Sequence, residues 1–392
     1  MIVQKPQLRY SRADSFDRNL NWVGFLHKLH FSHFMCGIAI VKRSSLTNDQ
    51  FEDLQRAIKR RGPDSYGEHE AAGFTLMGSV LSIQGTGLCT QPYIDSEGNI
   101  LLWNGEIFHG LEADSESTFS DTVLIANGLL RCHQYETSIQ AIAARITAFL
   151  SLCQGPFAFV YYIAALEFLF VGRDPFGRRS LLTFSATVDE DGKDGSWLGI
   201  SSVGTADSAF TWNELSVEGI FHQDCGSREG RESSLVLQEW PKERLRLGTG
   251  DGNFARPLLG PDEAASQFLA ALTLAVNRRV HCIRHRLPAA VEDSIAPLLP
   301  SSPPCPPPTS SIAPCTVGVL FSGGIDSVLL AAVLSKVLPA RETIDLINVT
   351  FLSSPASLTA DDESPSPDRV AAIAAFLELK VSCLNMRSFT KL

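Results

Sequence analysis

Short apolar runs, separated by Gly, Asn and Asp, recur along residues 36–222. Runs of this length with turn-forming residues at their ends are typical of β-strands. They occur at residues 38–41, 99–103, 157–163 and 168–171, and helical spacing between them predicts helices at 47–59 and 121–130. Ser120 is a candidate N-cap for the second helix. We therefore expect an α+β domain built in layers over residues 36–222.

The pattern weakens over residues 223–315, which we treat as a connecting region. One helix is predicted at 262–280, where apolar residues repeat at helical spacing. The segment 297–314 reads PLLPSSPPCPPPTSSIAP, and proline at this density is incompatible with the interior of a helix or a sheet. We therefore expect an extended linker there.

Residues 316–392 have a different pattern, in which fully apolar runs at 316–321 and 344–351 flank a helical segment at 328–338. A strand, helix, strand order with apolar strands predicts a βαβ unit of a parallel sheet. A Ser-, Pro- and Asp-rich stretch at 353–367 and a helix at 368–379 follow. The prediction is a partial α/β domain of the doubly wound type.

Composition narrows the possible functions. The 392 residues carry a formal net charge of −10 with scattered Lys and Arg, which argues against a nucleic-acid partner. No apolar stretch is long enough to predict a membrane span. The nine cysteines lack CxxC spacing, so we expect free thiols in a reducing, cytoplasmic compartment and no metal site. Residues 1–35 lack a secretory signal core and are interpreted as an N-terminal extension.

Candidate chemistry in the last domain lies in SGGIDS, between the first predicted strand and its helix. Ser322 and Ser327 supply hydroxyl groups, Gly323 and Gly324 allow close approach to the backbone, and Asp326 lies in the first helical turn. With the helix N-terminus, these residues predict a phosphate site. The alternative is a glycine turn capped by Asp326 or Ser327.

Candidate chemistry in the first domain lies in WNGEIF and SDT. The Asn104 side chain and the Gly105 backbone N–H form a candidate oxyanion hole, and Glu106 and Asp121 could hold an ammonium group. The alternative for Asn-Gly is a hairpin turn. Cys36 is a candidate thiolate nucleophile whose base would be its own α-amine, or else a small buried apolar residue.

An ordered set of motifs links these sites: MCGI at 35–38, RRGPDS at 60–65, TQP at 90–92, NGEIF, SDT, GPFAFVYY at 155–162 and GRDPFGRRSLL at 172–182. This set resembles the class II, N-terminal-nucleophile glutamine amidotransferase domain. With SGGIDS, a signature of the PP-loop ATP pyrophosphatases, the chain resembles the asparagine synthetases, and in particular the divergent branch of asparagine synthetase domain-containing proteins.

The resemblance implies a fold and a reaction. The first domain would be an αββα sandwich, in which Cys36 releases ammonia from glutamine, Asn104 and Gly105 stabilise the oxyanion, and Glu106 and Asp121 bind the substrate amine. Ser322, Gly323, Gly324, Asp326 and Ser327 would bind ATP, which Mg²⁺ would accompany. Ammonia would then convert an ATP-activated aspartate into asparagine. The partners that it implies are the small molecules glutamine, aspartate and ATP, with no nucleic acid and no membrane; it names no protein partner.

The sequence departs from the family pattern at three points. Val80 occupies the position of an arginine that pairs with the α-carboxylate of glutamine, the second domain is partial, and Cys36 is preceded by Met35. An acylated nitrogen cannot act as a base, so we expect translation to start at Met35. Two alternatives stay open: a catalytically impaired scaffold or binding protein, and a bare glutaminase.

Overall fold

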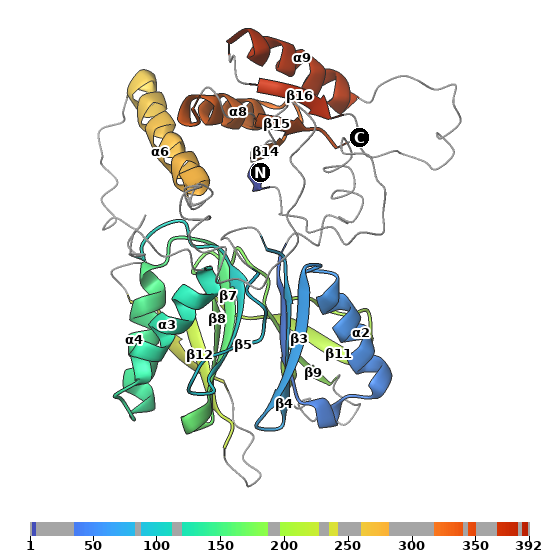
Figure 1. The fold of residues 1–392 in the computed structure, drawn as a ribbon, viewed down its shortest axis with the longest axis vertical. Helices are drawn as coiled ribbons and strands as arrows, with labels where there is room; N and C mark the ends of the chain where they lie inside the picture. Colours follow the sequence, from blue (N-terminus) through green and yellow to red (C-terminus); the bar gives the residue numbers. More distant parts are fainter. Residues whose placement is uncertain are drawn as a thin grey trace, which may run out of the picture. The chain divides into compact units, whose positions relative to one another are not determined.

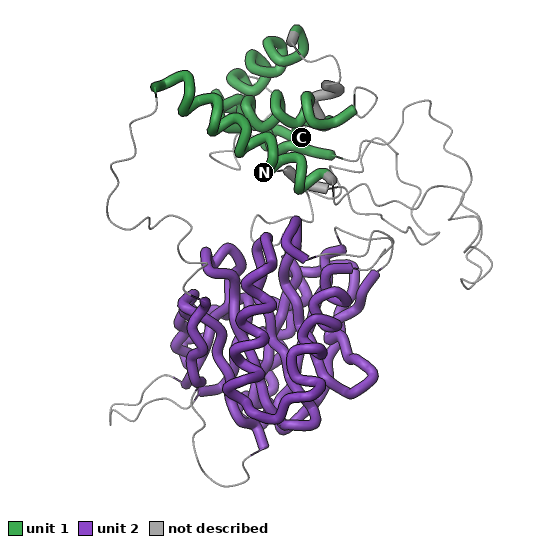
Figure 2. Tube along the Cα trace, turned by 90° about the vertical axis from the view of Figure 1, so that its left-hand side faces the viewer, with its two compact units in different colours: residues 1–28, 257–392 green, residues 29–256 purple. Residues whose placement is uncertain are grey.

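The computed structural model describes residues 2–4, 35–82, 88–111, 120–186, 197–226, 235–241, 260–281, 317–339, 344–349, 367–382 and 386–390. They form two compact units, one over residues 29–256 and the other over residues 1–28 with 257–392 (Figure 2). The predicted proline-rich linker at 297–314 lies outside the described residues, as does nearly all of the stretch at 353–367.

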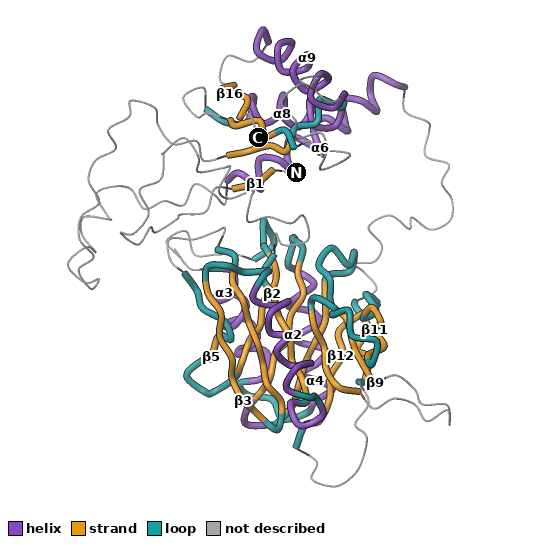
Figure 3. The backbone as a smooth tube through the Cα atoms, turned by 90° about the vertical axis from the view of Figure 1, so that its right-hand side faces the viewer, coloured by secondary structure: helices purple, strands orange, loops and turns teal. Residues whose placement is uncertain are grey.

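The unit over 29–256 contains two six-stranded antiparallel sheets (Figure 3). The order in the first is β11 (Phe210–Glu214), β9 (Leu182–Ala186), β10 (Trp197–Ser201), β2 (Gly37–Val41), β4 (Phe74–Val80) and β3 (Ser65–Ala71). The order in the second is β13 (Val236–Glu239), β12 (Gly219–Asp224), β8 (Phe168–Arg173), β7 (Phe157–Ile163), β6 (Ile100–Gly105) and β5 (Tyr93–Ile94).

Helices cover the outer faces of both sheets (Figure 1). Helix α2 (Asn48–Lys59) packs on the first sheet, and α3 (Asp121–His133) and α4 (Ile139–Leu152) pack on the second. Short 3₁₀ turns lie at Arg43–Ser45 and Ala164–Leu166. The predicted αββα sandwich is therefore confirmed.

Alternation along the strands explains why both faces of each sheet are buried. In β2, Ile38 and Ile40 enter the core between the sheets, whereas Ala39 and Val41 face α2. In β7, the side chains divide in the same way between that core and the helices α3 and α4. A strand buried on both faces reads as a continuous apolar run, which is why the sequence pattern located these strands.

The unit extends beyond residue 222, where the sequence pattern predicted its end. Strand β12 continues to Asp224 and pairs with β13, and Trp240 is buried in the core beneath α4. The helices also differ in detail from the prediction. Thr47, predicted to be the first helical residue, is the N-cap of α2 and forms a reciprocal pair with Gln50. Ser120 is the N-cap of α3 as predicted, although its hydroxyl makes no capping hydrogen bond.

The other unit holds a four-stranded sheet in the order β1 (Ile2–Gln4), β14 (Val317–Leu320), β15 (Ile344–Ile347) and β16 (Met386–Thr390). β14, β15 and β16 are parallel, which confirms the predicted βαβ unit, and β1 adds antiparallel to β14. The helices are α6 (Pro261–His281), α8 (Ile325–Val337) and α9 (Pro367–Ser382). Their apolar faces and the sheet share one core. Within the described residues, every helix is too short or too polar to cross a membrane.

Candidate active site

A pocket in the unit over 29–256 collects most of the candidate residues. It lies where the start of β2, the ends of β4 and β6, the start of α3 and the loop after β8 meet. Its lining includes Cys36, Asn104, Gly105, Glu106 and Asp121. The structure thus brings together every candidate that the sequence assigned to amide chemistry. Met35, Val80, Leu81, Ser82, Cys89, Gln91, Trp103, Ser120, Thr122 and Arg179 complete it.

Cys36 immediately precedes β2, a central strand of the first sheet. Its Sγ accepts a hydrogen bond from Leu81 N at 3.5 Å and lies 3.8 Å from Leu81 O. Burial raises the pKa of the Cys36 thiol to about 11, while Leu81 and the nearby Arg179 and Arg61 act in the opposite direction. The thiol is therefore protonated at neutral pH, and a thiolate needs a base to form.

The backbone after Cys36 is held by side chains from neighbouring elements. Gly37 N donates to Ser79 Oγ at 3.0 Å, and Ser79 Oγ donates to Ile58 O at 2.7 Å. A Cβ on Gly37 would lie 2.5 Å from Ser79 Oγ and 2.6 Å from Ile58 O, so only glycine fits there. Ile38 N donates to Ser202 Oγ at 3.0 Å. These contacts fix the position of the thiol.

The Asn-Gly pair is not a hairpin turn, so that alternative is wrong. Asn104 and Gly105 end β6 and pair in register with Ala158 and Phe157 of β7. Asn104 is 1% exposed, and its buried Nδ2 has no hydrogen-bond partner within the residues that the structure describes. A buried amide donor without a partner is costly, so Nδ2 is available to an oxygen that enters the pocket.

Gln91 holds the strand that carries the Asn-Gly pair. Its Nε2 donates to Trp103 O at 2.8 Å, and its Oε1 accepts from Trp103 N at 2.7 Å. The side-chain amide thereby makes both bonds that a neighbouring strand would make. Gln91 is buried, and the backbones of Gly67 and Gly78 pack directly against it. Gln91 belongs to the TQP motif, from which no role for this residue was predicted.

Two carboxylates, those of Glu106 and Asp121, line the same pocket. Asp121 is the first residue of α3, and its Oδ2 accepts from Ile107 N at 2.6 Å. Burial raises the pKa of Asp121 to about 7; the bond from Ile107 opposes this shift and the charge of Glu106 adds to it. The two acids disfavour each other's charge, and a cation between them would remove this penalty.

Two arginines, to which no role was assigned from the sequence, act on Cys36 through their positive charges. Arg61 is 5% exposed, and the described residues provide no hydrogen-bond partner for its Nε and Nη2 or for the buried Nε of Arg179. Burial lowers the pKa of both guanidinium groups, and Cys36 raises both because a thiolate would stabilise them. Glu106 also raises the pKa of Arg179. Val80, in the same lining, supplies no charge.

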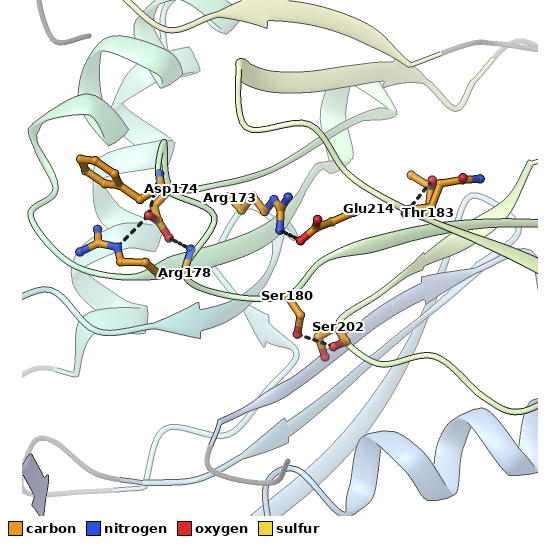
Figure 4. Close-up of polar contacts among 9 residues, drawn as sticks. Arg173, Asp174, Arg178, Ser180, Thr183, Ser202 and Glu214 are labelled. Carbon is orange, nitrogen blue, oxygen red and sulfur yellow. Dashed lines mark hydrogen bonds and ion pairs between the residues drawn. The ribbon is translucent and has the colours of Figure 1, made fainter. Parts of the chain in front are cut away.

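The loop after β8 fixes the position of Arg179, because both of its neighbours are anchored (Figure 4). Arg178 Nε donates to Asp174 Oδ1 at 2.9 Å, and its Nη2 donates to Gly155 O at 2.7 Å. Ser180 Oγ donates to Ser202 O at 2.7 Å. Ser202 in turn bonds the strand that follows Cys36, so this loop and the nucleophile share one support.

The second candidate site lies in the other unit, between β14 and α8. Gly323 has a φ of +81°, and a Cβ there would lie 2.5 Å from the α9 backbone at Ala371. Gly324 is the N-cap of α8, in place of Asp326 or Ser327. Gly324 N donates to Ser322 Oγ at 3.3 Å. Ser327 Oγ donates to Gly324 O at 2.9 Å.

This loop has the donors that a phosphate needs. Asp326 lies in the first turn of α8, which begins without a side-chain cap. Hydroxyl groups and a helix N-terminus are suitable partners for phosphate oxygens. Within the described residues, no three His, Cys, Asp or Glu side chains cluster as a metal site would require.

Comparisons with known proteins agree with this arrangement. Residues 35–193 match the glutamine amidotransferase domain, and residues 312–380 match the asparagine synthase family. Asparagine synthetase domain-containing protein 1 from Bos taurus is 29% identical over 397 residues, covering 81% of this chain and 56% of that protein. Its Mus musculus relative is 28% identical, with 88% and 66% covered. The chain thus spans between half and two thirds of these relatives.

A solved structure, the glutamine phosphoribosylpyrophosphate amidotransferase from B. subtilis, is 16% identical with a TM-score of 0.30; the match covers 54% of this chain and 45% of that one. By the family matches and the curated relatives, the protein resembles the asparagine synthetase domain-containing proteins, with a glutamine amidotransferase domain at 35–193 followed by an asparagine synthase segment at 312–380.

Proposed function

We propose that this chain is a glutamine-hydrolysing, asparagine synthetase-like enzyme. One observation carries the proposal: a single pocket collects a thiol, a buried amide donor without a partner, and two carboxylates. Such a set suits an amide substrate that also bears an ammonium group, which describes glutamine. The amidotransferase match over the same residues supports it.

Cys36 is the proposed nucleophile. Its Sγ attacks the side-chain amide carbon of glutamine, ammonia leaves, and water hydrolyses the resulting thioester to glutamate. With a thiol pKa of about 11, Cys36 needs a proton acceptor next to Sγ. The α-amine of Cys36 can serve once the bond to Met35 is removed, and Met35 already lies in the pocket lining.

Asn104 and Gly105 are the proposed oxyanion hole. The Nδ2 group of Asn104 has no partner among the described residues, so it can donate to the tetrahedral oxygen without breaking an existing bond to them. A preorganised donor of this kind contributes about 10²–10³-fold to kcat. Gln91 keeps the donor in place through its two bonds to Trp103.

Glu106 and Asp121 are the proposed partners of the α-ammonium group. An incoming cation would stabilise the ionised form of Asp121, whose pKa is raised to about 7 without it. Binding of the amine and ionisation of Asp121 are therefore coupled. This arrangement selects an α-amino acid over a simple amide.

In the other unit, Ser322, Gly323, Gly324, Asp326 and Ser327 are the proposed ATP site, with Mg²⁺ as its companion. When bound, ATP supplies the activation of an aspartate side-chain carboxyl, which ammonia then converts into asparagine. The chain's contribution is to hold the pyrophosphate with its hydroxyl groups and helix N-terminus. The asparagine synthase match at 312–380 supports this assignment.

Glutamate release tests the proposal. A chain that starts at Met35, so that removal of Met exposes Cys36, is compared with its Cys36→Ala and Asn104→Ala variants. We expect glutamate release from the first, none above background from Cys36→Ala, and about 10²–10³-fold less from Asn104→Ala. Equal release from all three would end the amidotransferase proposal.

A catalytically impaired scaffold or binding protein is the second candidate. Val80 favours it, because the lining provides no cation at that position. It predicts weak glutamine binding and no hydrolysis, even with a free Cys36 amine. A bare glutaminase would instead release ammonia and make no asparagine when ATP and aspartate are added.

A further inference from the structure

Two arginines at the amide site have donors that the described residues leave unpaired. Arg179 lines the pocket, and Arg61 is close enough to Arg179 and Cys36 to interact with their charges. Nε and Nη2 of Arg61 and Nε of Arg179 are buried, and none has a hydrogen-bond partner in the part of the chain that the structure describes. An unpaired buried donor on a charged group carries a large desolvation cost. Arg61 and Arg179 also repel each other, since each is a cation in the same buried region. An anion from outside the chain would offset these costs.

Among the described residues, three anionic groups act on Arg179, namely Glu106, Cys36 and Asp174, and none replaces an external anion. Asp174 already accepts hydrogen bonds from the side chain of Arg178 and from backbone N–H groups. The thiol of Cys36 is protonated at rest because burial raises its pKa. Glu106 attracts Arg179, but it contacts the same pocket as Asp121 and serves the ammonium group in the proposed function. The guanidinium groups therefore have hydrogen-bond donors left for a carboxylate of the substrate.

The pocket as a whole matches an α-amino acid. Acids from the end of β6 and the start of α3 suit the ammonium group, and Arg179 in the loop after β8 suits the carboxylate. Anchoring of Arg178 and Ser180 on either side of Arg179 keeps that loop in register with Cys36. Val80 leaves an apolar surface where no competing cation lies.

We propose that Arg179 binds the α-carboxylate of glutamine, with Arg61 as a second positive charge behind it. The inference rests on the proposed function and adds the residue that selects the carboxylate. A guanidinium group suits this role because it can donate two parallel hydrogen bonds to a carboxylate.

Calorimetric titration of the full chain tests this assignment, since binding does not need a free Cys36 amine. The two ligands are glutamine and 4-aminobutanamide, which is glutamine without its α-carboxylate. We expect wild-type protein to bind glutamine more tightly. Arg179→Ala should weaken the binding of glutamine about 10–100-fold, as expected for loss of a charge-assisted pair. It should weaken the binding of 4-aminobutanamide less than about twofold.

Further variants separate carboxylate binding from folding. Arg179→Lys, which keeps the charge but loses the planar fork, should weaken glutamine by an intermediate factor. Arg145→Ala removes an arginine whose side chain is 51% exposed and pairs with Glu136, and should change neither affinity. Equal weakening of both ligands by Arg179→Ala and by Arg179→Lys would overturn the proposal, because Arg179 would then act through Glu106 or the fold.

The same titration distinguishes this inference from the function on which it rests. If wild-type protein binds glutamine and Arg179→Ala binds it equally well, only the carboxylate assignment fails. If wild-type protein binds neither ligand, the glutamine site itself fails and the assignment falls with it.

Discussion

Gly37 N donates a hydrogen bond to Ser79 Oγ at 3.0 Å, and this bond fixes the residue that follows the candidate nucleophile. Because Ser79 Oγ also donates to Ile58 O, one hydroxyl ties the start of β2 to β4 and to the end of α2. The thiol therefore sits on a junction of three elements. Small changes at this junction should affect both the fold and the chemistry.

Gly37→Ala should destabilise the unit. The added Cβ would lie within 2.6 Å of two oxygens, one of them a backbone oxygen, so the strand must shift. We expect the free energy of unfolding to fall by about 1–3 kcal/mol. Urea unfolding followed by tryptophan fluorescence would report this, because tryptophans 103, 197, 212 and 240 all belong to this unit.

Gly204→Ala is the matched control for that measurement. A Cβ at Gly204 would meet its nearest atom, in Trp212, at 3.4 Å, which is ordinary contact. It should change the free energy of unfolding by less than about 0.5 kcal/mol. Equal effects of the two substitutions would contradict the steric argument.

Asp121→Asn should stabilise the protein in a pH-dependent way. Burial raises the pKa of Asp121 from 3.8 to about 7, so folding takes up a proton between these values. The carboxylate therefore costs stability as pH rises through this window, and the cost is complete above about pH 7. The asparagine amide can still accept from Ile107 N and carries no charge.

We expect Asp121→Asn to raise the free energy of unfolding by about 1–3 kcal/mol at about pH 8, and by little at about pH 4. The gain in the free energy of unfolding is smaller than the whole pKa shift of Asp121 would give, because the carboxylate lines a pocket. Urea unfolding at both pH values measures the difference. A constant difference at the two pH values would argue against a raised pKa.

Alkylation of Cys36 should report its protonation state. Because burial raises the thiol pKa to about 11, only a small thiolate fraction exists at neutral pH. The rate of modification by iodoacetamide should rise about tenfold per pH unit between about pH 7 and 10. Mass spectrometry of the Cys36 peptide gives this rate site by site.

Two further samples serve as controls for the alkylation experiment. In urea-unfolded chain the rate should level off near about pH 9, as for an ordinary thiol. In a chain with Cys36 at its N-terminus, the free amine should accelerate modification near neutral pH. A rate in the folded full chain that is flat from about pH 7 to 9 would mean that the thiolate already exists.

Gln91→Glu should weaken the support of the Asn-Gly pair. The introduced carboxylate can accept from Trp103 N but cannot donate to Trp103 O, which it would face at close range. We expect a loss of about 2–4 kcal/mol in the free energy of unfolding at neutral pH. Glutamate release by the Met35-start chain should fall mainly through kcat.

Acid should partly reverse the effect of Gln91→Glu. A protonated carboxyl can donate to Trp103 O, so the folded state raises the pKa of the introduced group and the lost stability returns as pH falls. Gln91→Leu, which forms neither bond, is the control and should show no recovery in urea unfolding at about pH 4–5. Identical pH profiles for the two variants would refute the proposed bond exchange.

Much of the fold was predictable because its strands are buried on both faces. Continuous apolar runs located β2, β7 and β8, and the motif order placed Cys36 and Asn104 in one domain. The local sequence pattern gave the wrong structure where the same residues also suit another local structure. Asn-Gly favours a turn, yet tertiary pairing with β7 keeps it extended.

The arginines show a second limit of sequence interpretation. Arg173, Arg178 and Arg179 are alike in the sequence and differ only in their partners. Arg173 pairs with Glu214 at 2.6 Å and Arg178 with Asp174 at 2.9 Å, whereas Arg179 lines the pocket. These partners come from distant strands or depend on loop geometry, so no spacing rule could single out Arg179.

The two bonds from Gln91 to Trp103 bear on how this site tolerates evolutionary change. A single amide replaces a stretch of neighbouring strand beside Trp103, since β5 is only two residues long and begins at Tyr93. Insertions and deletions ahead of Gln91 need not shift the ladder that aligns Asn104. Homologues could therefore vary that connection in length while keeping the hydrolytic apparatus in register.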